Sequence, residues 1–167
     1  MTGAPESLRQ ERTTRVRRTA RVVLLDTSDR ILLMKGRLES DPSGPGAWFT
    51  VGGGIEPGET LAEAAIREVR EETGFAEILI ETLLWTGGQR YRDRNGAEVR
   101  IEEHFILARC VGGEPSRDGW EPQERELIDD IRWWSPGDLR ELRDAIVPID
   151  LAERLAGLLD GWRRPAE

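Results

Sequence analysis

The chain has 167 residues, of which 38% are hydrophobic and 34% are charged, and its formal net charge is −8. These values predict one compact soluble domain, and no apolar run reaches the roughly 18 residues that span a bilayer. The acidic excess makes nucleic acid an unlikely partner, because affinity for phosphate backbones depends on basic surface.

The N-terminal segment is polar and rich in arginine. It lacks the apolar core of a secretory signal, and the single cysteine, Cys110, excludes an internal disulfide, so we expect a cytoplasmic protein without a membrane partner. Residues 1–15 are predicted to form a flexible arm, and residues 16–162 a single domain. The basic arm could contact a polyanion, although a solvated arm explains its composition equally simply.

Short apolar runs predict the strands that precede a glycine-rich stretch. Residues 22–25 and 31–34 are separated by a polar segment, which favours two strands in a hairpin. Residues 37–47 are rich in proline, glycine and serine and predict a loop. Residues 48–51 then predict a short strand that leads into three glycines at 52–54.

Two more strands are predicted in the second half of the chain, at residues 78–85 and 99–109. The polar residues 87–96 are expected to connect them. Within this connection the dipeptide Asn95-Gly96 favours a tight turn, so the two strands are predicted to form a hairpin.

The C-terminal part predicts helices after an irregular segment at residues 112–122. Ser135 followed by Pro136 is typical of a helix start, with serine as the N-cap and proline at the first helical position. An amphipathic helix is predicted near residues 150–159. Its apolar side consists of Leu151, Leu155, Leu158 and Leu159.

A helix is predicted between Leu61 and Glu72, in the most informative part of the chain. Thr60 and Glu63 have the T-x-x-E spacing of a capping box, and Gly74 suits the left-handed residue that closes a helix. At about 100° per residue, one stripe of the helix is expected to face the core. This stripe consists of Ala62, Ala65, Ile66 and Val69.

Three glutamates, Glu68, Glu71 and Glu72, are predicted to share an adjacent face of this helix, because spacings of three and four bring side chains together. Their charges repel one another, and Arg67 offsets only part of the repulsion. Mg²⁺ prefers carboxylate and carbonyl oxygens, and the glycine turn could supply the carbonyl groups. The cluster therefore suggests metal-assisted phosphoryl chemistry, although three glutamates alone could equally form an exposed acidic face.

The glutamates belong to a longer pattern, G-x5-E-x7-R-E-Φ-x-E-E-x-G-Φ, where Φ is apolar. It is formed by Gly53, Glu59, Arg67, Glu68, Val69, Glu71, Glu72, Gly74 and Phe75. In this pattern residues 53–75 resemble the Nudix box at every defining position, and the similarity extends over roughly residues 18–145. The resemblance implies an α/β fold, a Nudix-type α/β/α sandwich with a mixed β-sheet in which the box forms a loop–helix–loop.

The resemblance also implies an enzyme, a Nudix hydrolase that acts as a metal-dependent pyrophosphohydrolase. Such an enzyme uses Mg²⁺ or Mn²⁺ and water to cleave the diphosphate bond of a nucleoside diphosphate derivative, such as a nucleoside triphosphate or ADP-ribose. Two alternatives stay open: a nucleotide-sensing module without turnover, and removal of pyrophosphate from RNA 5′ ends. The complete set of carboxylates argues against the first, and the net charge argues against the second. A homodimer also stays open.

By position, the resemblance assigns roles to residues of the box. Glu68, Glu71 and Glu72 are the expected metal ligands, with the carbonyl of Gly52 as a further ligand. Arg67 and Glu59 resemble the pair that orients the catalytic helix. A glutamate outside the box is expected to serve as general base or ligand. The candidates are Glu103, Glu121, Glu124 and Glu126, and Glu124 is preferred.

Substrate contacts are expected from loops and strand ends around the box. The candidates are Arg37, Trp48, Gly53, Gly54, Arg90 and Tyr91, with Trp85 and Trp120 as further ones. Trp48 fits a core position as well as a base-stacking one, and His104, the only histidine, is expected to be structural. The box indicates which bond is cleaved but does not indicate the groups attached to it.

Overall fold

The computed structural model describes residues 14–37, 43–93 and 95–163, so residues 1–13 of the predicted arm lie outside it. Its strands are β1 (Arg15–Leu25), β2 (Ile31–Gly36), β3 (Ala47–Thr50), β4 (Leu79–Arg92), β5 (Glu98–Arg109), β6 (Ile128–Trp134) and β7 (Ile146–Val147). Its helices are α1 (Leu61–Thr73), α2 (Pro122–Leu127), α3 (Pro136–Glu141) and α4 (Leu151–Arg163). Among these described helices, none combines the length and apolar character needed to cross a membrane.

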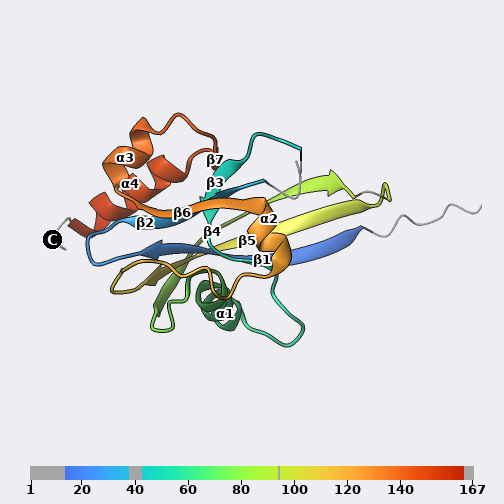
Figure 1. Cartoon of the computed structure of the whole chain (residues 1–167), viewed down its shortest axis with the longest axis horizontal. Coiled ribbons are helices and arrows are strands. Elements are labelled where there is room, and N and C mark those ends of the chain that lie inside the picture. Colours follow the sequence, from blue (N-terminus) through green and yellow to red (C-terminus); the bar gives the residue numbers. More distant parts are fainter. Residues whose placement is uncertain (1–13, 38–42, 94, 164–167) are drawn as a thin grey trace, which may run out of the picture.

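The strands form one mixed sheet with helices on both faces (Figure 1). The order is β4-β5-β1-β2-β3-β7, and β6 pairs with β2. β1 lies parallel to β5 and β3 parallel to β7, whereas the other pairs are antiparallel. α1 covers one face, and α3 and α4 cover the other (Figure 1). The predicted α/β/α sandwich with a mixed sheet is therefore confirmed.

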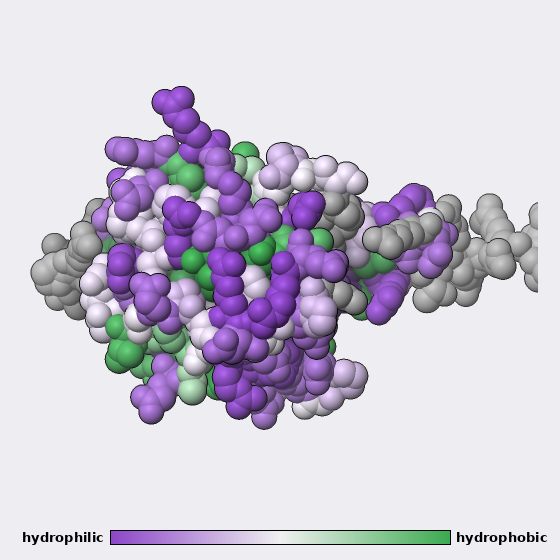
Figure 2. Space-filling model, in the orientation of Figure 1, coloured by the Kyte–Doolittle hydropathy of each residue, from purple (hydrophilic) through white to green (hydrophobic). Residues whose placement is uncertain are grey.

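Each face of the sheet carries its own apolar core, because side chains alternate along the strands. In β1, Val22 and Leu24 belong to the core under α1, and Val23 and Leu25 belong to the core under α3 and α4. The second core is closed by Leu139, Leu151, Leu155 and Leu159 of the two C-terminal helices. The surface seen in Figure 2 is mainly hydrophilic, with small hydrophobic spots.

Helix α1 is capped as the sequence predicted, with the hydroxyl of Thr60 accepting the amide of Glu63 and with φ 77° at Gly74. Its buried face differs from the predicted stripe. The buried residues are Ala64, Ala65, Val69, Glu72 and Thr73. Ile66, predicted in the core, is 41% exposed, and Ala62 is only partly buried. Compared with the predicted orientation, the buried face of α1 is shifted toward the acidic side of the helix. Glu68 and Glu72 on that side pack against the glycine turn instead of facing solvent.

Strand β4 is longer than the sequence predicted. It pairs with β5 as far as Arg92 opposite Glu98, so residues 87–92 belong to the strand and not to a connection. β4 ends at Arg92 and β5 begins at Glu98, and between them the carboxylate of Asp93 accepts the amides of Asn95 and Ala97, each at 2.9 Å. The polar sequence was misleading because β4 is an edge strand whose side chains are mostly exposed.

The only lysine, Lys35 in β2, is joined to Trp48 in β3 by one carboxylate. Lys35 Nζ lies 2.8 Å from Asp144 Oδ2, and the indole N–H of Trp48 donates to the same oxygen at 3.2 Å. The hydrogen bonds from Lys35 and then Trp48 lower the pKa of Asp144. Asp144 therefore ties the segment before β7 to the centre of the sheet.

Asp144→Asn should destabilise the fold at pH 7 and have little effect at about pH 2. The folded-state pKa is lower than the unfolded value of about 3.9, so the stabilisation is present above that value and is lost as the pH falls through the folded-state pKa. Urea unfolding at both pH values measures the difference. Lys35→Met should reproduce the loss at pH 7, and an equally large loss for Asp144→Asn at both pH values would contradict the assignment.

Candidate active site

The glycine turn at residues 52–54 is held against β1 by backbone hydrogen bonds. The amide of Ala20 donates to the carbonyl of Gly53 at 2.9 Å, and the amide of Ile55 donates to the carbonyl of Arg18 at 3.0 Å. At Gly52, φ is 135°, and a Cβ would lie 2.1 Å from the carbonyl oxygen of Ala20. Only glycine fits this close approach, so β1 and Gly52 together fix the position of the turn.

Glu72 is the most buried carboxylate of the box, with 8% of the residue exposed. Its Oε2 accepts the amide of Gly52 at 2.8 Å. Burial raises the pKa of Glu72 well above its usual value, and the charges of Glu68 and Glu124 act in the same direction, against the Gly52 amide and Arg21. The ionised form of Glu72 is therefore under-compensated, which favours a bound cation.

Glu68 faces the same turn, one helical turn earlier. Its side chain is 12% exposed, and a Cβ on Gly53 would lie 2.5 Å from Glu68 Oε1. Burial raises the pKa of Glu68, while Arg67 lowers it. The Glu68 carboxylate thus occupies the place where a side chain at position 53 would begin, so residue 53 must be glycine for Glu68 to lie there.

Arg67 connects the acidic residues of the box. Its Nε lies 2.9 Å from Glu59 Oε1, and its Nη1 lies 2.7 Å from Glu68 Oε1 and 3.1 Å from Glu71 Oε2. It also donates to the carbonyl of Gly54 at 2.8 Å. These contacts raise the pKa of Arg67, the hydrogen bond to Glu59 being the largest cause, and lower the pKa of Glu59. The guanidinium fixes the helix relative to the turn.

Of the candidate carboxylates outside the box, Glu124 is the one whose charge acts on both Glu68 and Glu72. It lies partly buried in α2, and its charge raises the pKa of both Glu68 and Glu72. Glu103 instead forms an ion pair with Arg21, with Oε1 of Glu103 lying 2.9 Å from Nε of Arg21. The Nη1 of Arg21 also donates to the carbonyl of Gly52 at 3.2 Å. The remaining candidates, Glu121 and Glu126, are exposed.

The donors fit a hard divalent cation, although they are not gathered into a finished site. Within residues 14–37, 43–93 and 95–163, no three histidine, cysteine, aspartate or glutamate side chains are close enough to hold a metal as they stand. The under-compensated carboxylates of Glu68 and Glu72, with the Gly52 carbonyl nearby, are nevertheless all-oxygen donors of the kind that Mg²⁺ and Mn²⁺ prefer. Glu71, with a side chain that is 47% exposed, lies at the rim of this group.

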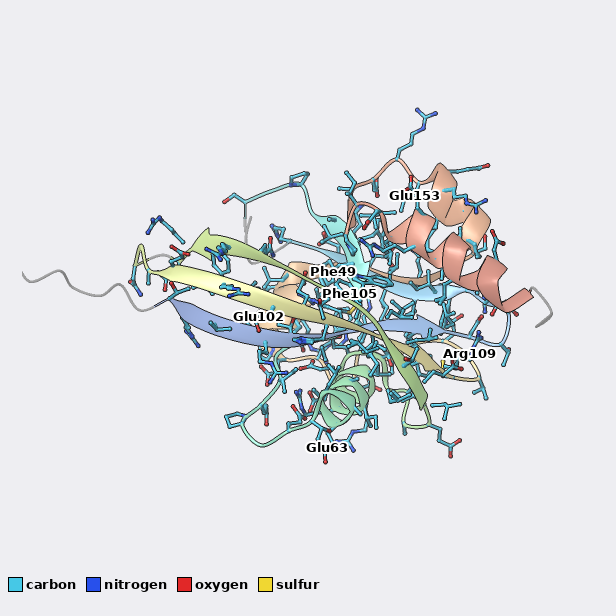
Figure 3. The ribbon with its side chains drawn as sticks, turned by 180° about the vertical axis from the view of Figure 1, so that it is seen from behind. Phe49, Glu63, Glu102, Phe105, Arg109 and Glu153 are labelled. Carbon is cyan, nitrogen blue, oxygen red and sulfur yellow. The ribbon has the colours of Figure 1, made fainter. Side chains whose placement is uncertain are left out.

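A cavity of about 150 Å³ borders the other side of the glycine turn. It is lined by Arg17, Thr19, Arg21, Arg37, Phe49, Thr50, Gly52, Gly53, Gln89, Ile101, Glu103, Phe105 and Val147. Figure 3 shows Phe49 and Phe105 next to each other near the middle of the sheet, away from Glu63 on α1. Thr19 is 3% exposed, and its hydroxyl has no hydrogen-bond partner within the described part of the chain. The cavity combines basic groups, apolar walls and an unsatisfied hydroxyl.

The predicted substrate contacts lie in different places. Arg37 and Gly53 line the cavity, and Gly54 lies in the same turn with its carbonyl bound by Arg67. Arg90 is exposed on β4 and pairs with Glu98 at 3.6 Å, and neither Arg90 nor its neighbour Tyr91 is among the residues that line the cavity.

The three tryptophans considered as substrate contacts pack in the cores. Trp48 is 2% exposed and contacts Trp134 edge to face, with ring centroids 4.9 Å apart. Trp85 stacks on Phe105, also at 4.9 Å. Trp120 is 5% exposed, and its indole N–H donates to the backbone carbonyl of Glu72. The three side chains therefore have packing roles in the cores, and a contact of any of them with a substrate stays a prediction.

Sequence analysis missed most of the cavity, including Thr19, Arg21, Phe49 and Gln89. Thr19 and Arg21 lie in β1, Phe49 in β3 and Gln89 in β4, so they come together through the pairing of distant strands, including β1 with β5, which local patterns do not reveal. One signal was available. Arg21 interrupts the apolar run from Ala20 to Leu25, as a charged residue does when it faces a cleft.

Comparison with known proteins gives the same picture. The family model of the NUDIX domain matches residues 15–155. The nucleoside triphosphatase NudI of Escherichia coli O1:K1 / APEC is 36% identical over 118 residues, which cover 69% of this chain and 79% of that protein. Two solved structures share the fold. The NUDIX domain of Shewanella oneidensis NrtR, in complex with ADP ribose, has a TM-score of 0.61 and 22% identity, covering 88% of this chain and 89% of that one. The MutT NUDIX hydrolase from Burkholderia pseudomallei has a TM-score of 0.56 and 24% identity, and the match covers 83% of this chain and 95% of that one.

Gly53→Ala should weaken Mn²⁺ binding by about tenfold to a hundredfold, the range seen when the neighbours of a ligand are changed. The added Cβ would lie 2.5 Å from Glu68 Oε1 and would displace that carboxylate. Isothermal titration with Mn²⁺ measures the affinity. Gly54→Ala is the matched control, because its Cβ would approach no atom closer than 3.9 Å. Equal affinities for Gly53→Ala and the wild type would contradict the placement of Glu68.

Proposed function

The chain belongs to the Nudix family of hydrolases, and on that premise we propose that it is a metal-dependent pyrophosphohydrolase of nucleoside diphosphate derivatives. The observation that carries the proposal is the buried carboxylate of Glu72, which is bound to the amide of Gly52, a residue that also lines the basic cavity. The 36% identity to NudI supports nucleoside triphosphates as the substrate class.

The carboxylate cluster would hold the cation, and the glycine turn would place it beside the cavity. Nudix hydrolases generally use divalent metals, and a bound Mg²⁺ or Mn²⁺ would neutralise the diphosphate and lower the pKa of a water. Glu68, Glu71, Glu72 and the carbonyl of Gly52 are the proposed ligands. Arg67 keeps the helix in register with the turn through Glu59 and Gly54.

Glu124 is the proposed general base, because it is the carboxylate outside the box whose charge acts on both Glu68 and Glu72. It would accept the proton of the water that attacks phosphorus. A general base contributes about 10² to 10⁴ in rate when it is within hydrogen-bond reach of that water. α2 therefore completes a reaction centre that is otherwise built on α1.

The cavity is the proposed substrate site. Arg17, Arg21 and Arg37 provide positive charge for phosphate oxygens, because guanidinium groups bind phosphate in two-pronged hydrogen bonds. Phe49 offers an aromatic wall to a nucleoside. The hydroxyl of Thr19 remains available to a bound substrate on the cavity floor.

Among the alternatives, turnover is favoured over nucleotide sensing because each carboxylate of the box is present and α1 presents two of them to the turn. The basic arm that suggested RNA lies outside the described residues and adds no support. Cys110 is buried and unpaired, which supports the expected cytoplasmic location.

Glu72→Gln should lower kcat at least about a hundredfold and leave the fold at least as stable at pH 7 without metal. The stability follows from the raised pKa of Glu72: the neutral amide avoids the cost of burying a charge. Phosphate release from a panel of nucleoside diphosphate derivatives, with Mg²⁺ and Mn²⁺, measures kcat. Glu77→Gln, at an exposed position after α1, is the control. Wild-type turnover by Glu72→Gln would sink the proposal.

Thr19→Val should raise KM about threefold to tenfold, the effect of losing one neutral hydrogen bond, with little change in kcat. The substitution keeps the side-chain shape and removes a buried hydroxyl that has no partner within the described residues, so the melting temperature should stay equal or rise. Steady-state kinetics and thermal unfolding on the same preparations test both parts. An unchanged KM together with a lower melting temperature would show that the hydroxyl serves the fold and not the substrate.

A further inference from the structure

The C-terminal end of α1 is covered by residues 116–120, which we call the strap. The last carbonyl groups of a helix have no partner within the helix and need one from outside. The amide of Ser116 donates to the carbonyl of Thr73 at 2.8 Å, and the indole N–H of Trp120 donates to the carbonyl of Glu72 at 2.6 Å. The strap thus binds the very residue that carries the buried carboxylate.

The strap is packed tightly against the helix. A Cβ on Gly119 would lie 2.3 Å from the carbonyl oxygen of Glu71. Trp120 is 5% exposed within the core under α1, and the guanidinium carbon of Arg117 lies 4.9 Å from its ring centroid. A buried indole needs a partner for its N–H, so the Trp120 ring has one favourable orientation, toward Glu72.

The strap continues directly into α2, which carries Glu124. Arg125 of α2 donates through Nε to the carbonyl of Trp120 at 3.1 Å and through Nη2 to the carbonyl of Arg117 at 2.9 Å. The amide of Glu121 donates to Glu124 Oε2 at 2.7 Å. Trp120 is therefore bound to α1 on one side and to α2 on the other.

We propose that Trp120 is a positioning residue, which fixes α2, and with it Glu124, relative to Glu68 and Glu72 of α1, so that Glu124 can act on the cation site that these two carboxylates help to form. This inference rests on the proposed function, and Trp120 itself touches neither substrate nor metal. The hydrogen bond to Glu72 joins residues 48 positions apart in the chain.

Such a device is needed because the carboxylates repel one another. The carboxylates of Glu124, Glu68 and Glu72 have charges of the same sign that act on one another, so electrostatics favours moving α2 away from α1 in the absence of a cation. α2 has six residues, and a helix of that length has little stability of its own. The strap opposes the repulsion through hydrogen bonds to the backbone of α1, which do not depend on a cation.

The test is Trp120→Phe, which keeps an aromatic ring and removes the N–H donor. Mn²⁺ affinity is measured by titration without substrate, and kcat and KM are measured with Mg²⁺. We expect about tenfold weaker Mn²⁺ binding, in line with other changes behind a ligand, and a lower kcat with little change in KM. Trp133→Phe is the matched control. Its indole N–H also donates to a carbonyl, that of Gly113 at 2.7 Å, which lies outside α1 and α2, so Mn²⁺ affinity should stay at the wild-type value.

A double-mutant cycle separates positioning from general stabilisation. In a Glu124→Gln background, Trp120→Phe should weaken Mn²⁺ binding clearly less than it does alone, because part of its effect passes through Glu124. Equal losses in both backgrounds, or wild-type Mn²⁺ affinity in Trp120→Phe, would overturn the inference. A wild-type protein that neither binds Mn²⁺ nor hydrolyses nucleotides would overturn the proposed function instead.

If Trp120→Phe does not fold, Gly119→Ala tests the same point. Its Cβ would meet the Glu71 carbonyl and lift the strap, whereas Gly137→Ala in α3 would meet no atom closer than 3.7 Å. Weaker Mn²⁺ binding in Gly119→Ala than in Gly137→Ala supports the inference, and equal binding contradicts it.

Discussion

A carboxylate on the inner face of a helix must be compensated, and the arrangement around Glu72 follows from that requirement. Its hydrogen-bond donor is the amide of Gly52, which is available because the backbone there adopts φ 135° and passes within contact of Ala20. Arg21 binds the carbonyl of the same glycine and is itself paired with Glu103. The two backbone groups of Gly52 thus couple β1, the glycine turn and α1, and we propose that a cation supplies the charge compensation that Glu72 still lacks.

The glycine turn also lies between the two parts that a pyrophosphohydrolase needs, the carboxylates that would bind a metal and the cavity that would bind a substrate. The carboxylates approach it from α1, while the basic cavity borders it from the opposite face of the sheet. Because Gly53 has no side chain, Glu68 can occupy the space beside the turn, and Gly53 still lines the cavity. Gly52 and Gly53 border both the carboxylate side of the turn and the cavity, so a cation bound at the turn would lie close to a substrate in the cavity.

Sequence reasoning succeeded where the determinants are local and failed where they depend on distant pairing. The caps of α1 and the start of α3 were predicted because hydroxyl and glycine signals act within one turn of the helix. Ile66 was misplaced because the stripe was defined by apolar residues alone, although the buried face includes Glu72. The packing of Trp85 and Trp120 was not predicted, because no local pattern tells which face of a strand, or which end of a helix, a long-range contact will cover. Glu124 was selected from the sequence and its charge acts on Glu68 and Glu72, but its role stays a proposal.

Anomalous diffraction from crystals soaked in Mn²⁺ tests the central claim most directly, because it locates the metal without reference to activity. The account predicts a manganese peak within about 2.5 Å of carboxylate oxygens of both Glu68 and Glu72, beside the glycine turn. Peaks confined to other parts of the surface, with Glu72 still bound only to the Gly52 amide and Glu68 only to Arg67, would contradict it.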